Sequence, residues 1–378
     1  MFKIIFFIKK IKLYCSYLFY DMIRKNKRDS NMKVLMIGPA RSVNGGISAV
    51  VNTYYRFGLE TKVDVKYIGT MEDGSKWHKL FVAFSALFQF TGCVRKYDIV
   101  HINMASDVSL CRKLIFIWIA KWNGKKVIIH QHGGYIEEFY ERQCSDFLRK
   151  VIRKTLRKAD KFLVIAPYLA DFFSNIVEKE KIIVFPNSVF IPEIGEKDYT
   201  KGKILFLGRL CKEKGISELL DACRELRESG MQLELYLGGV WEDRSLKEKA
   251  DECSDWVCQL GWIDVREKDK YLRECSIFAL PSYFEGQSVS LLEAMSYKCA
   301  CVASKVGGIP QMLIHEKTGL FSKVRDRESL KKQLERYLKD TKLQEEMGKA
   351  AFEKIKREFD IQKNMNKLFE LYEELGKN

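Results

Sequence analysis

Short apolar runs alternate along most of this chain with longer segments whose apolar residues recur at helical spacing. The run Val34–Ile37 has the length of a buried strand, and the segment Ile47–Tyr55 that follows it has the period of a helix. Strands that alternate with helices form βαβ units, in which the strands are parallel and helices cover both faces of the sheet. The pattern therefore predicts an α/β fold.

The same pattern extends from Met32 to the end of the chain. Before residue 190 the expected strands are Val34–Ile37, Val63–Tyr67, Ile99–Ile102, Val127–Ile129, Phe162–Ile165 and Ile182–Phe185. The expected helices between them are Ile47–Tyr55, Lys79–Val94, Leu110–Lys121, Phe147–Lys158 and Tyr168–Ile176. After residue 200 the expected strands are Ile204–Leu207, Gln232–Leu237, Val257–Leu260, Ile277–Leu280 and Ala300–Ala303. The helices expected there are Ile216–Glu228, Ser245–Cys253, Lys268–Arg273, Val289–Tyr297, Arg327–Leu338, Leu343–Phe359 and Gln362–Leu375.

The length of the chain, 378 residues, is too great for one ordinary core and suits two domains. The periodicity stops between Pro186 and Gly202, where proline and glycine punctuate a polar connection. We therefore expect two doubly wound, Rossmann-like parallel-sheet domains, residues 32–190 and 200–358. They are expected to face each other across a cleft, which is the expected active site.

Residues 1–31 mix apolar and basic side chains, and their uncharged runs are too short to span a bilayer. One interpretation is a basic aromatic segment that lies on a membrane. The other is an extension upstream of the fold, because Met32–Gly38 reads as the natural start of a first strand. The net charge of +15 suits an anionic membrane surface or an acidic substrate. No zinc-finger spacing or aromatic-basic RNA-binding signature is present, so nucleic acid is not expected as a partner.

Two further segments bear on whether the protein contacts a membrane. Phe147–Lys158 is an amphipathic basic helix, which is either a solvated face or a contact with anionic lipid. Leu80–Phe90 is apolar nearly all round, and we expect a core helix there, with a groove for an acceptor lipid as the alternative. The eleven cysteines are scattered without CxxC spacing, as expected for reduced, buried thiols in the cytosol. We expect a cytoplasmic protein, peripheral on the inner face of the membrane.

Two cations follow one predicted strand of the second domain. Arg209 and Lys214 come directly after Ile204–Leu207, between Gly208 and Gly215. Ligands of open α/β sheets bind where strands end and helices begin. An arginine can grip a phosphate with two donors, and a lysine supplies a compact charge. The segment therefore predicts a binding site for an anionic diphosphate.

Two carboxylates follow another strand of the same domain, Ile277–Leu280. Glu293 lies just over one turn into a helix, where a carboxylate can accept two vicinal ribose hydroxyls. Glu285 can orient the hydroxyls of a sugar. The backbone N–H groups of Gly286, Gln287 and Ser288 can hold a phosphate. Cations and carboxylates together suit a nucleotide diphosphate sugar.

Two sites in the first half complete the candidates. Gly45 and Gly46 open the first helix, and they let the backbone come close to a bulky anion. His132 follows the strand Val127–Ile129, and it can exchange a proton or form a hydrogen bond with substrate. His130 is expected to be structural and His101 to lie in the core or at the cleft edge. No third ligand stands at a recognised spacing, so we expect no metal site.

Taken together, the segments resemble the retaining nucleotide-sugar glycosyltransferases of the GT-B architecture, glycosyltransferase family four (glycosyl transferases group 1). The resemblance covers the chain from about Met32 and is strongest from Lys203 to Leu320. It is carried, in order, by Gly45-Gly46, His132-Gly133, Pro186-Asn187, Gly208-Arg209-Leu210, Lys214-Gly215, Glu285-Gly286, Leu292-Glu293-Ala294-Met295 and Gly307-Gly308-Ile309-Pro310. The chain departs from the family pattern at Ser188, Lys298, Ala300 and Gln311, but at no charged donor ligand.

The resemblance implies a role for each candidate. Arg209 and Lys214 would hold the donor diphosphate, and Glu293 would bind the ribose. Glu285 with Gly286–Ser288 would hold the transferred sugar and its phosphate. His132 would contact the sugar near the reacting carbon. A last helix, residues 359–378, would cross back onto the first domain.

The expected reaction is transfer of a sugar, of the hexosyltransferase type, from a nucleotide diphosphate donor to a hydroxyl acceptor. The acceptor is expected to be a saccharide or lipid-linked saccharide in surface polysaccharide synthesis. Retention follows from the resemblance alone, and no metal or cofactor is expected. Two alternatives stay open, a sugar epimerase of the same architecture and a catalytically silent partner subunit. A nicotinamide oxidoreductase is disfavoured, because the first glycine turn lacks the full fingerprint.

Overall fold

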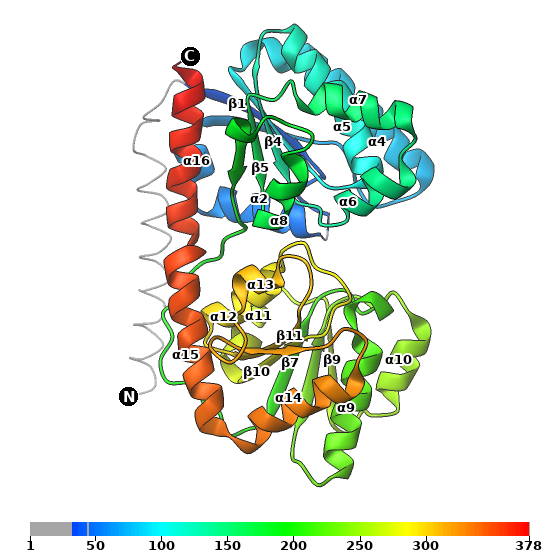
Figure 1. Ribbon diagram of the computed structural model, residues 1–378, viewed down its shortest axis with the longest axis vertical. Coiled ribbons are helices and arrows are strands. Elements are labelled where there is room, and N and C mark those ends of the chain that lie inside the picture. Colours follow the sequence, from blue (N-terminus) through cyan, green and yellow to red (C-terminus); the bar gives the residue numbers. More distant parts are fainter. Residues whose placement is uncertain (1–31, 44, 378) are drawn as a thin grey trace, which may run out of the picture. The chain divides into compact units, whose positions relative to one another are not determined.

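The computed structural model describes residues 32–43 and 45–377. The expected membrane segment or extension at residues 1–31 lies outside the described part of the chain. Within that part the strands form two six-stranded parallel sheets, with helices packed on them (Figure 1). The predicted α/β fold with two doubly wound sheets is confirmed.

The first sheet has the strand order β2-β1-β3-β4-β5-β6. Its strands are β1 (Lys33–Gly38), β2 (Asp64–Gly69), β3 (Ile99–Met104), β4 (Lys126–Gln131), β5 (Lys161–Val164) and β6 (Ile182–Val184). Its longer helices are α2 (Gly46–Arg56), α4 (Lys76–Cys93), α5 (Asp107–Trp122), α7 (Asp146–Leu156) and α8 (Pro167–Phe173). All six residues of β3 are buried, as expected of a strand covered on both faces.

The second sheet has the order β12-β11-β10-β7-β8-β9. Its strands are β7 (Lys203–Leu207), β8 (Glu234–Gly238), β9 (Val257–Gly261), β10 (Ile277–Leu280), β11 (Ala300–Ser304) and β12 (Leu320–Ser322). Its helices are α9 (Ile216–Glu228), α10 (Arg244–Asp251), α11 (Val265–Glu274), α12 (Val289–Ser296), α13 (Ile309–Met312), α14 (Arg327–Lys339) and α15 (Thr341–Glu358). Helices α9 and α14 pack side by side (Figure 1).

The chain divides into two compact units whose boundary does not follow the two sheets. The first unit holds the residues up to Asn103, then Ile115–Ile128 and Met365–Asn378. The second unit holds Met104–Leu114 and Ile129–Asn364. The loops after β4, β7 and β10 therefore all belong to the second unit.

The last helix, α16 (Ile361–Gly376), contributes most of its length to the first unit. The Tyr372 hydroxyl lies 2.6 Å from Nδ1 of His101 on β3, and both side chains are fully buried. His101 is thus a core residue, which is one of the two places predicted for it.

Most expected elements lie within two or three residues of their observed bounds. One prediction about burial is wrong. Leu80–Phe90 is not a core helix, because Phe81, Phe84 and Phe88 of α4 are exposed by 71%, 73% and 78%. The helix buries only Ala86 and Phe90, so the sheet covers one narrow side of it. No helix in the described ranges has both the length and the apolar character needed to cross a bilayer.

Candidate active site

The carboxylate of Glu285 and the ammonium of Lys214 form a largely buried ion pair in the second unit. Oε1 of Glu285 accepts a hydrogen bond from Nζ of Lys214 at 2.5 Å and one from Oγ of Ser282 at 2.7 Å. The Glu285 and Lys214 side chains are only 11% and 19% exposed. The two come from loops at the carboxyl ends of the adjacent strands β10 and β7. Two candidate residues that were predicted from separate segments of the sequence therefore meet at one edge of the sheet.

Gly215 sets the position of the Lys214 turn. Its φ is +70°, in the left-handed region that glycine adopts without strain. A Cβ at this position would lie 2.2 Å from the carbonyl oxygen of Pro281. Only a glycine therefore lets the start of α9 approach the loop after β10 so closely. This approach places the Lys214 ammonium within reach of Glu285.

The backbone from Gly286 to Ser288 is held from two sides. The N–H of Gly308 donates to the carbonyl oxygen of Glu285 at 3.1 Å, and a Cβ on Gly308 would lie 2.0 Å from the carbonyl oxygen of Gly286. Ser288 caps α12, because its Oγ accepts from the N–H of Leu291 at 3.3 Å. The predicted phosphate loop is thus rigidly seated at the positive end of a helix.

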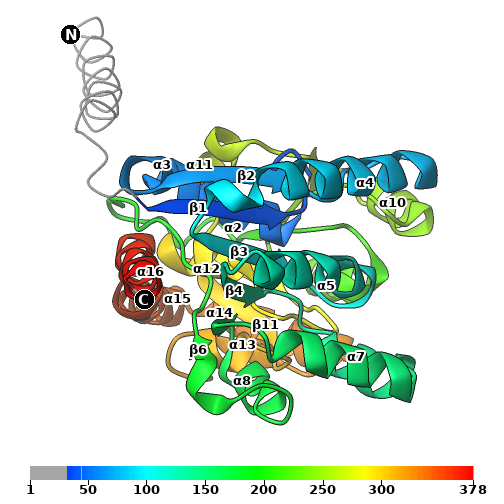
Figure 2. The ribbon, with the colours of Figure 1, turned by 90° about the horizontal axis from the view of Figure 1, so that it is seen from above.

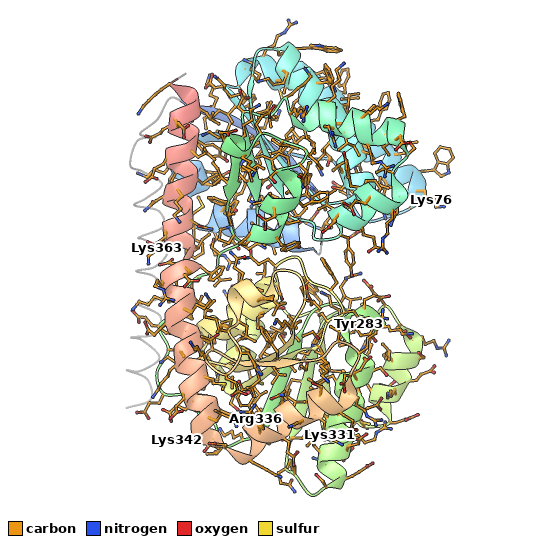
Figure 3. The ribbon with its side chains drawn as sticks, viewed as in Figure 1. Lys76, Tyr283, Lys331, Arg336, Lys342 and Lys363 are labelled. Atoms are coloured by element: carbon orange, nitrogen blue, oxygen red, sulfur yellow. The ribbon has the colours of Figure 1, made fainter. Side chains whose placement is uncertain are left out.

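The loop after β4 lies against the Glu285 loop within the same unit. A Cβ on Gly134 would lie 2.7 Å from Cα of Gly286 and 2.4 Å from the ring of Phe284. The rings of Tyr135 and Phe284 lie 4.2 Å apart, centroid to centroid. This contact brings the segment that begins at His132 beside the segment that carries Glu285. The neighbouring side chain of Tyr283, labelled in Figure 3, donates from its hydroxyl to Glu218 at 2.6 Å.

His132 has an imidazole that stays neutral at ordinary pH. Burial lowers the pKa of His132 to about 3. The charge of Lys113 also lowers this pKa, whereas a hydrogen bond with Asn187 raises it. Asn187 is itself fixed, since its N–H donates to Oε1 of Gln287 at 2.5 Å. The neutral ring can form hydrogen bonds with a ligand, but it is not a proton donor near pH 7. His130 packs its ring 3.9 Å from that of His132, and it is fully buried, as expected of a structural residue.

Arg209 and Glu293 each have a partner of their own. Nη1 of Arg209 donates to Oε2 of Glu242 at 3.0 Å, and the Arg209 side chain is 61% exposed. Glu293 on α12 is paired with Lys268 of α11. The four predicted charged residues are therefore not one contact cluster. Lys214 and Glu285 touch, while Arg209 and Glu293 are bound to charges that the sequence reasoning did not select.

Gly45 and Gly46 lie at the start of α2 in the first unit. Gly45 is the extended residue before the helix, and Gly46 is its first residue. A Cβ on either glycine would meet nothing within 4 Å. Packing within the described residues therefore does not require glycine at these positions.

A cavity of 480 Å³ adjoins the contact between the two loops. Tyr135, Tyr168 and Phe284 supply aromatic surface to it, and the carboxylates of Glu137, Glu138 and Glu141 supply hydrogen-bond acceptors. Arg142 adds a cation, so charged groups line much of this cavity. Sequence reasoning missed these residues. Two of them could have been found from their neighbours in the sequence, because Tyr135 directly follows Gly133-Gly134 and Phe284 directly precedes Glu285.

Comparison with known protein families shows which family this chain belongs to. The model for "Glycosyl transferases group 1" matches residues 188–354, and that for "Glycosyltransferase Family 4" matches residues 60–190. The chain belongs to the family 4 glycosyltransferases. The resemblance seen in the sequence is confirmed, and the protein is an enzyme of the glycosyltransferase type.

Several curated glycosyltransferases are similar over much of the chain. An Escherichia coli "UDP-Gal:alpha-D-GlcNAc-diphosphoundecaprenol alpha-1,3-galactosyltransferase" is 26% identical over 303 residues, which cover 73% of this chain and 75% of that protein. An uncharacterized glycosyltransferase of Methanocaldococcus jannaschii is 27% identical over 66% of this chain and 69% of its own length. The putative colanic acid biosynthesis glycosyltransferase WcaL of Escherichia coli is 28% identical over 56% of this chain, and the match spans only 55% of WcaL.

Solved structures share the fold at low sequence identity. Sucrose-phosphate synthase from Thermosynechococcus elongatus superposes with a TM-score of 0.74 at 17% identity, over 91% of this chain and 99% of that one. HepE of Anabaena, solved in complex with UDP and glucose, gives 0.73 at 17% identity, over 91% of this chain and 100% of that one. The predicted GT-B fold of this glycosyltransferase is thereby confirmed.

Proposed function

We propose that this glycosyltransferase transfers a sugar from a nucleotide diphosphate donor to a hydroxyl of a lipid-linked saccharide, in the synthesis of a surface polysaccharide. One relative and one protein that shares the fold support this assignment. The Escherichia coli relative is named for a UDP-galactose donor and a diphosphoundecaprenol-linked acceptor. HepE was solved with UDP and glucose.

The observation that carries the proposal is the Lys214–Glu285 pair beside the loop of His132. Lys214 offers a positive charge, and Glu285 offers a carboxylate, within hydrogen-bond distance of each other. A sugar diphosphate presents the complementary pair of groups, an anionic phosphate next to hydroxyls. Lys214 would bind the diphosphate, Glu285 the sugar hydroxyls, and Glu293 the ribose.

In the proposed reaction, negative charge grows on the leaving diphosphate as its bond to the sugar breaks. Lys214, Arg209 and the N–H groups at the start of α12 would stabilise that charge, without a requirement for metal. Arg209 can leave Glu242 for a phosphate at little cost, because an exposed ion pair contributes about 0–1 kcal/mol. The leaving phosphate would accept the proton of the attacking hydroxyl. From family membership we also propose that the transferred sugar retains its anomeric configuration.

The test is transfer by the purified full chain, with a panel of nucleotide sugars and an undecaprenyl-diphosphate saccharide. Arg209→Ala and Glu293→Ala should each lower the rate by roughly 10²–10³-fold, since each removes a group that contacts the donor. Lys247→Ala on the exposed side of α10 serves as the control and should match the wild type. Full activity in either site variant would contradict the assigned site. A product that is an epimer of the donor sugar, formed without acceptor, would identify an epimerase.

The same assay tests the metal independence and the stereochemistry. Addition of EDTA should leave the transfer rate unchanged, and loss of activity that Mg²⁺ or Mn²⁺ restores would contradict that part of the proposal. The anomeric configuration of the product, read by NMR, should equal that of the donor. Inversion would contradict retention without affecting the donor assignment.

A further inference from the structure

Helix α4 exposes an unusual row of large apolar side chains. Its exposed members have 59% to 81% of their surface accessible, and they are Trp77, Leu80, Phe81, Phe84 and Phe88. Positions 77, 81, 84 and 88 are spaced by four, three and four residues, so they lie along one face of the helix. An amphipathic helix of a globular protein normally turns such a face to the core. Here the side that packs inward is instead the narrow one around Ala86 and Phe90.

Helix α5 extends this apolar surface within the first unit. The rings of Phe90 and Phe116 pack edge to face with their centroids 5.0 Å apart, so the two helices are in contact (Figure 2). On α5, Ile115 is 48% exposed and Trp122 is 78% exposed. We call the whole surface the α4–α5 patch, made of Trp77, Leu80, Phe81, Phe84, Phe88, Ile115 and Trp122.

Basic side chains stand at both ends of the α4–α5 patch. Lys76, labelled in Figure 3, and Lys79 lie in the first turn of α4, and the helix contains no Asp or Glu. Exposed Arg95 and Lys96 follow its last turn. Lys125 donates to the carbonyl oxygen of Arg95 at 3.0 Å, which fixes the end of α5 beside these residues.

The acidic groups near the patch are few. Glu72 lies before α4, where its carboxylate is 3.2 Å from Nε2 of His78. Asp73 and Asp98 flank the helix in sequence, outside its apolar row. The charges that border the patch are therefore mainly positive.

We propose that the α4–α5 patch docks this protein on an anionic membrane surface. Trp and Phe side chains favour the interface between headgroups and acyl chains, and lysines beside them attract anionic headgroups. Each such cation contributes about 1 kcal/mol near an anionic surface. The cores of protein–protein interfaces are depleted in Lys, whereas Lys76 and Lys79 adjoin the apolar row directly. The docking stands on this surface alone and does not require the proposed reaction.

The test is sedimentation of the full chain with vesicles of phosphatidylglycerol and phosphatidylcholine at low and high salt. The wild type should bind phosphatidylglycerol vesicles, and salt should weaken the binding. The triple variant Phe81→Ser, Phe84→Ser and Phe88→Ser should bind roughly tenfold or more weakly, because three rings no longer enter the interface. The matched control changes three exposed apolar residues elsewhere, Phe190→Ser, Trp262→Ser and Val265→Ser, and should bind like the wild type. Thermal unfolding shows whether each variant remains folded.

A second measurement tests whether this surface itself enters the membrane. Brominated phosphatidylglycerol should quench the fluorescence of Trp77, and the variant Trp77→Phe should lose that share of the quenching. Three outcomes would overturn the proposal. These are no binding to phosphatidylglycerol at low salt, equal binding by the folded triple variant, and a vesicle-free dimer that the triple variant dissociates. The last outcome would make the patch an interface between two copies of this chain.

Discussion

Lys214 and Glu285 show how the fold brings two ordinary side chains into one largely buried ion pair. Each alone is a common surface residue, but here both are largely removed from water and share one hydrogen bond. A largely buried charge that loses its partner is costly, so each residue depends on the other when no ligand is present. A diphosphate that enters between them would meet a cation already desolvated and oriented. Such preorganisation is what makes charge stabilisation effective in a site.

His132 provides a prediction about protonation. Its pKa of about 3 means that the folded protein keeps the ring neutral between pH 5 and 8. In NMR spectra of ¹³C-labelled histidine, the signal that disappears in His132→Gln should not shift over this range. The unfolded chain takes up a proton below about pH 6.5, while the folded chain does not until about pH 3. The free energy of unfolding should therefore fall as the pH falls from 6.5 toward 3, and less so in His132→Gln. A signal that titrates near pH 6.5 would contradict the burial of this ring.

Lys113 provides a second prediction about protonation, which applies above pH 7. The side chain is 1% exposed, and Nζ donates to Oγ of Ser109 at 3.0 Å. Burial, with a smaller contribution from Arg112, lowers the pKa of Lys113 to about 7. Between about pH 7 and pH 10.5 the unfolded chain holds a proton that the folded chain has lost, so the free energy of unfolding rises with pH there.

The variant Lys113→Met removes the cost of burying an ammonium group, and its side chain has a similar volume. In urea unfolding it should be more stable than the wild type at pH 7, by at least about 1 kcal/mol. The difference should become smaller at pH 10. A difference that stays constant from pH 7 to pH 10 would show that the amine keeps its ordinary pKa in the folded state, and would contradict the lowered pKa.

At the scale of elements, hydrophobic patterning predicted most of the strands and helices. The strands of parallel sheets are buried on both faces, so β1 and β7 contain the continuous apolar runs Val34–Ile37 and Ile204–Leu207, which are visible in the sequence. The strand β12, with the three residues Leu320–Ser322, was missed because so short a segment carries no period. The apolar pattern of α4 was visible, but its exposure was not. Whether a helix face is covered depends on what the fold places over it.

The contact between the loops after β4 and β10 leads to a prediction about Gly134. A Cβ there would lie 2.7 Å from a backbone atom, Cα of Gly286, which cannot move aside as a side chain could. Gly134→Ala should lower the free energy of unfolding by about 1–3 kcal/mol and reduce transfer, because the His132 and Glu285 loops must separate. The control Gly46→Ala meets no atom within 4 Å and should leave the stability unchanged or slightly higher. Thermal unfolding of both variants checks this, and an unaffected Gly134→Ala would mean that the loops are not in contact.

At the scale of the whole molecule, the positions of the candidate residues after strands were predictable, but their partners were not. Glycines, cations and carboxylates in the sequence predicted loops that do follow β4, β7 and β10 in the structure. The ion pair of Lys214 with Glu285 joins residues 71 positions apart, and the hydrogen bond of Asn187 with Gln287 joins residues 100 positions apart. The ion pair arises from the order of strands in the second sheet, β10 beside β7, and the hydrogen bond joins the segment after β6 to the loop after β10. Local periodicity encodes neither. For the same reason, the sequence did not predict that Glu242 pairs with Arg209 or that Lys268 pairs with Glu293.

The binding of a nucleoside diphosphate tests the central claim most directly. Isothermal titration of the purified full chain with UDP, GDP and ADP should find at least one that binds. Lys214→Ala should weaken that binding by about tenfold or more, since one charge-assisted contact contributes roughly 1.5–3 kcal/mol. Lys212→Ala, which removes an exposed lysine from the same turn, should bind with the affinity of the wild type. Equal affinity of Lys214→Ala and the wild type would contradict a diphosphate site at the Lys214–Glu285 pair.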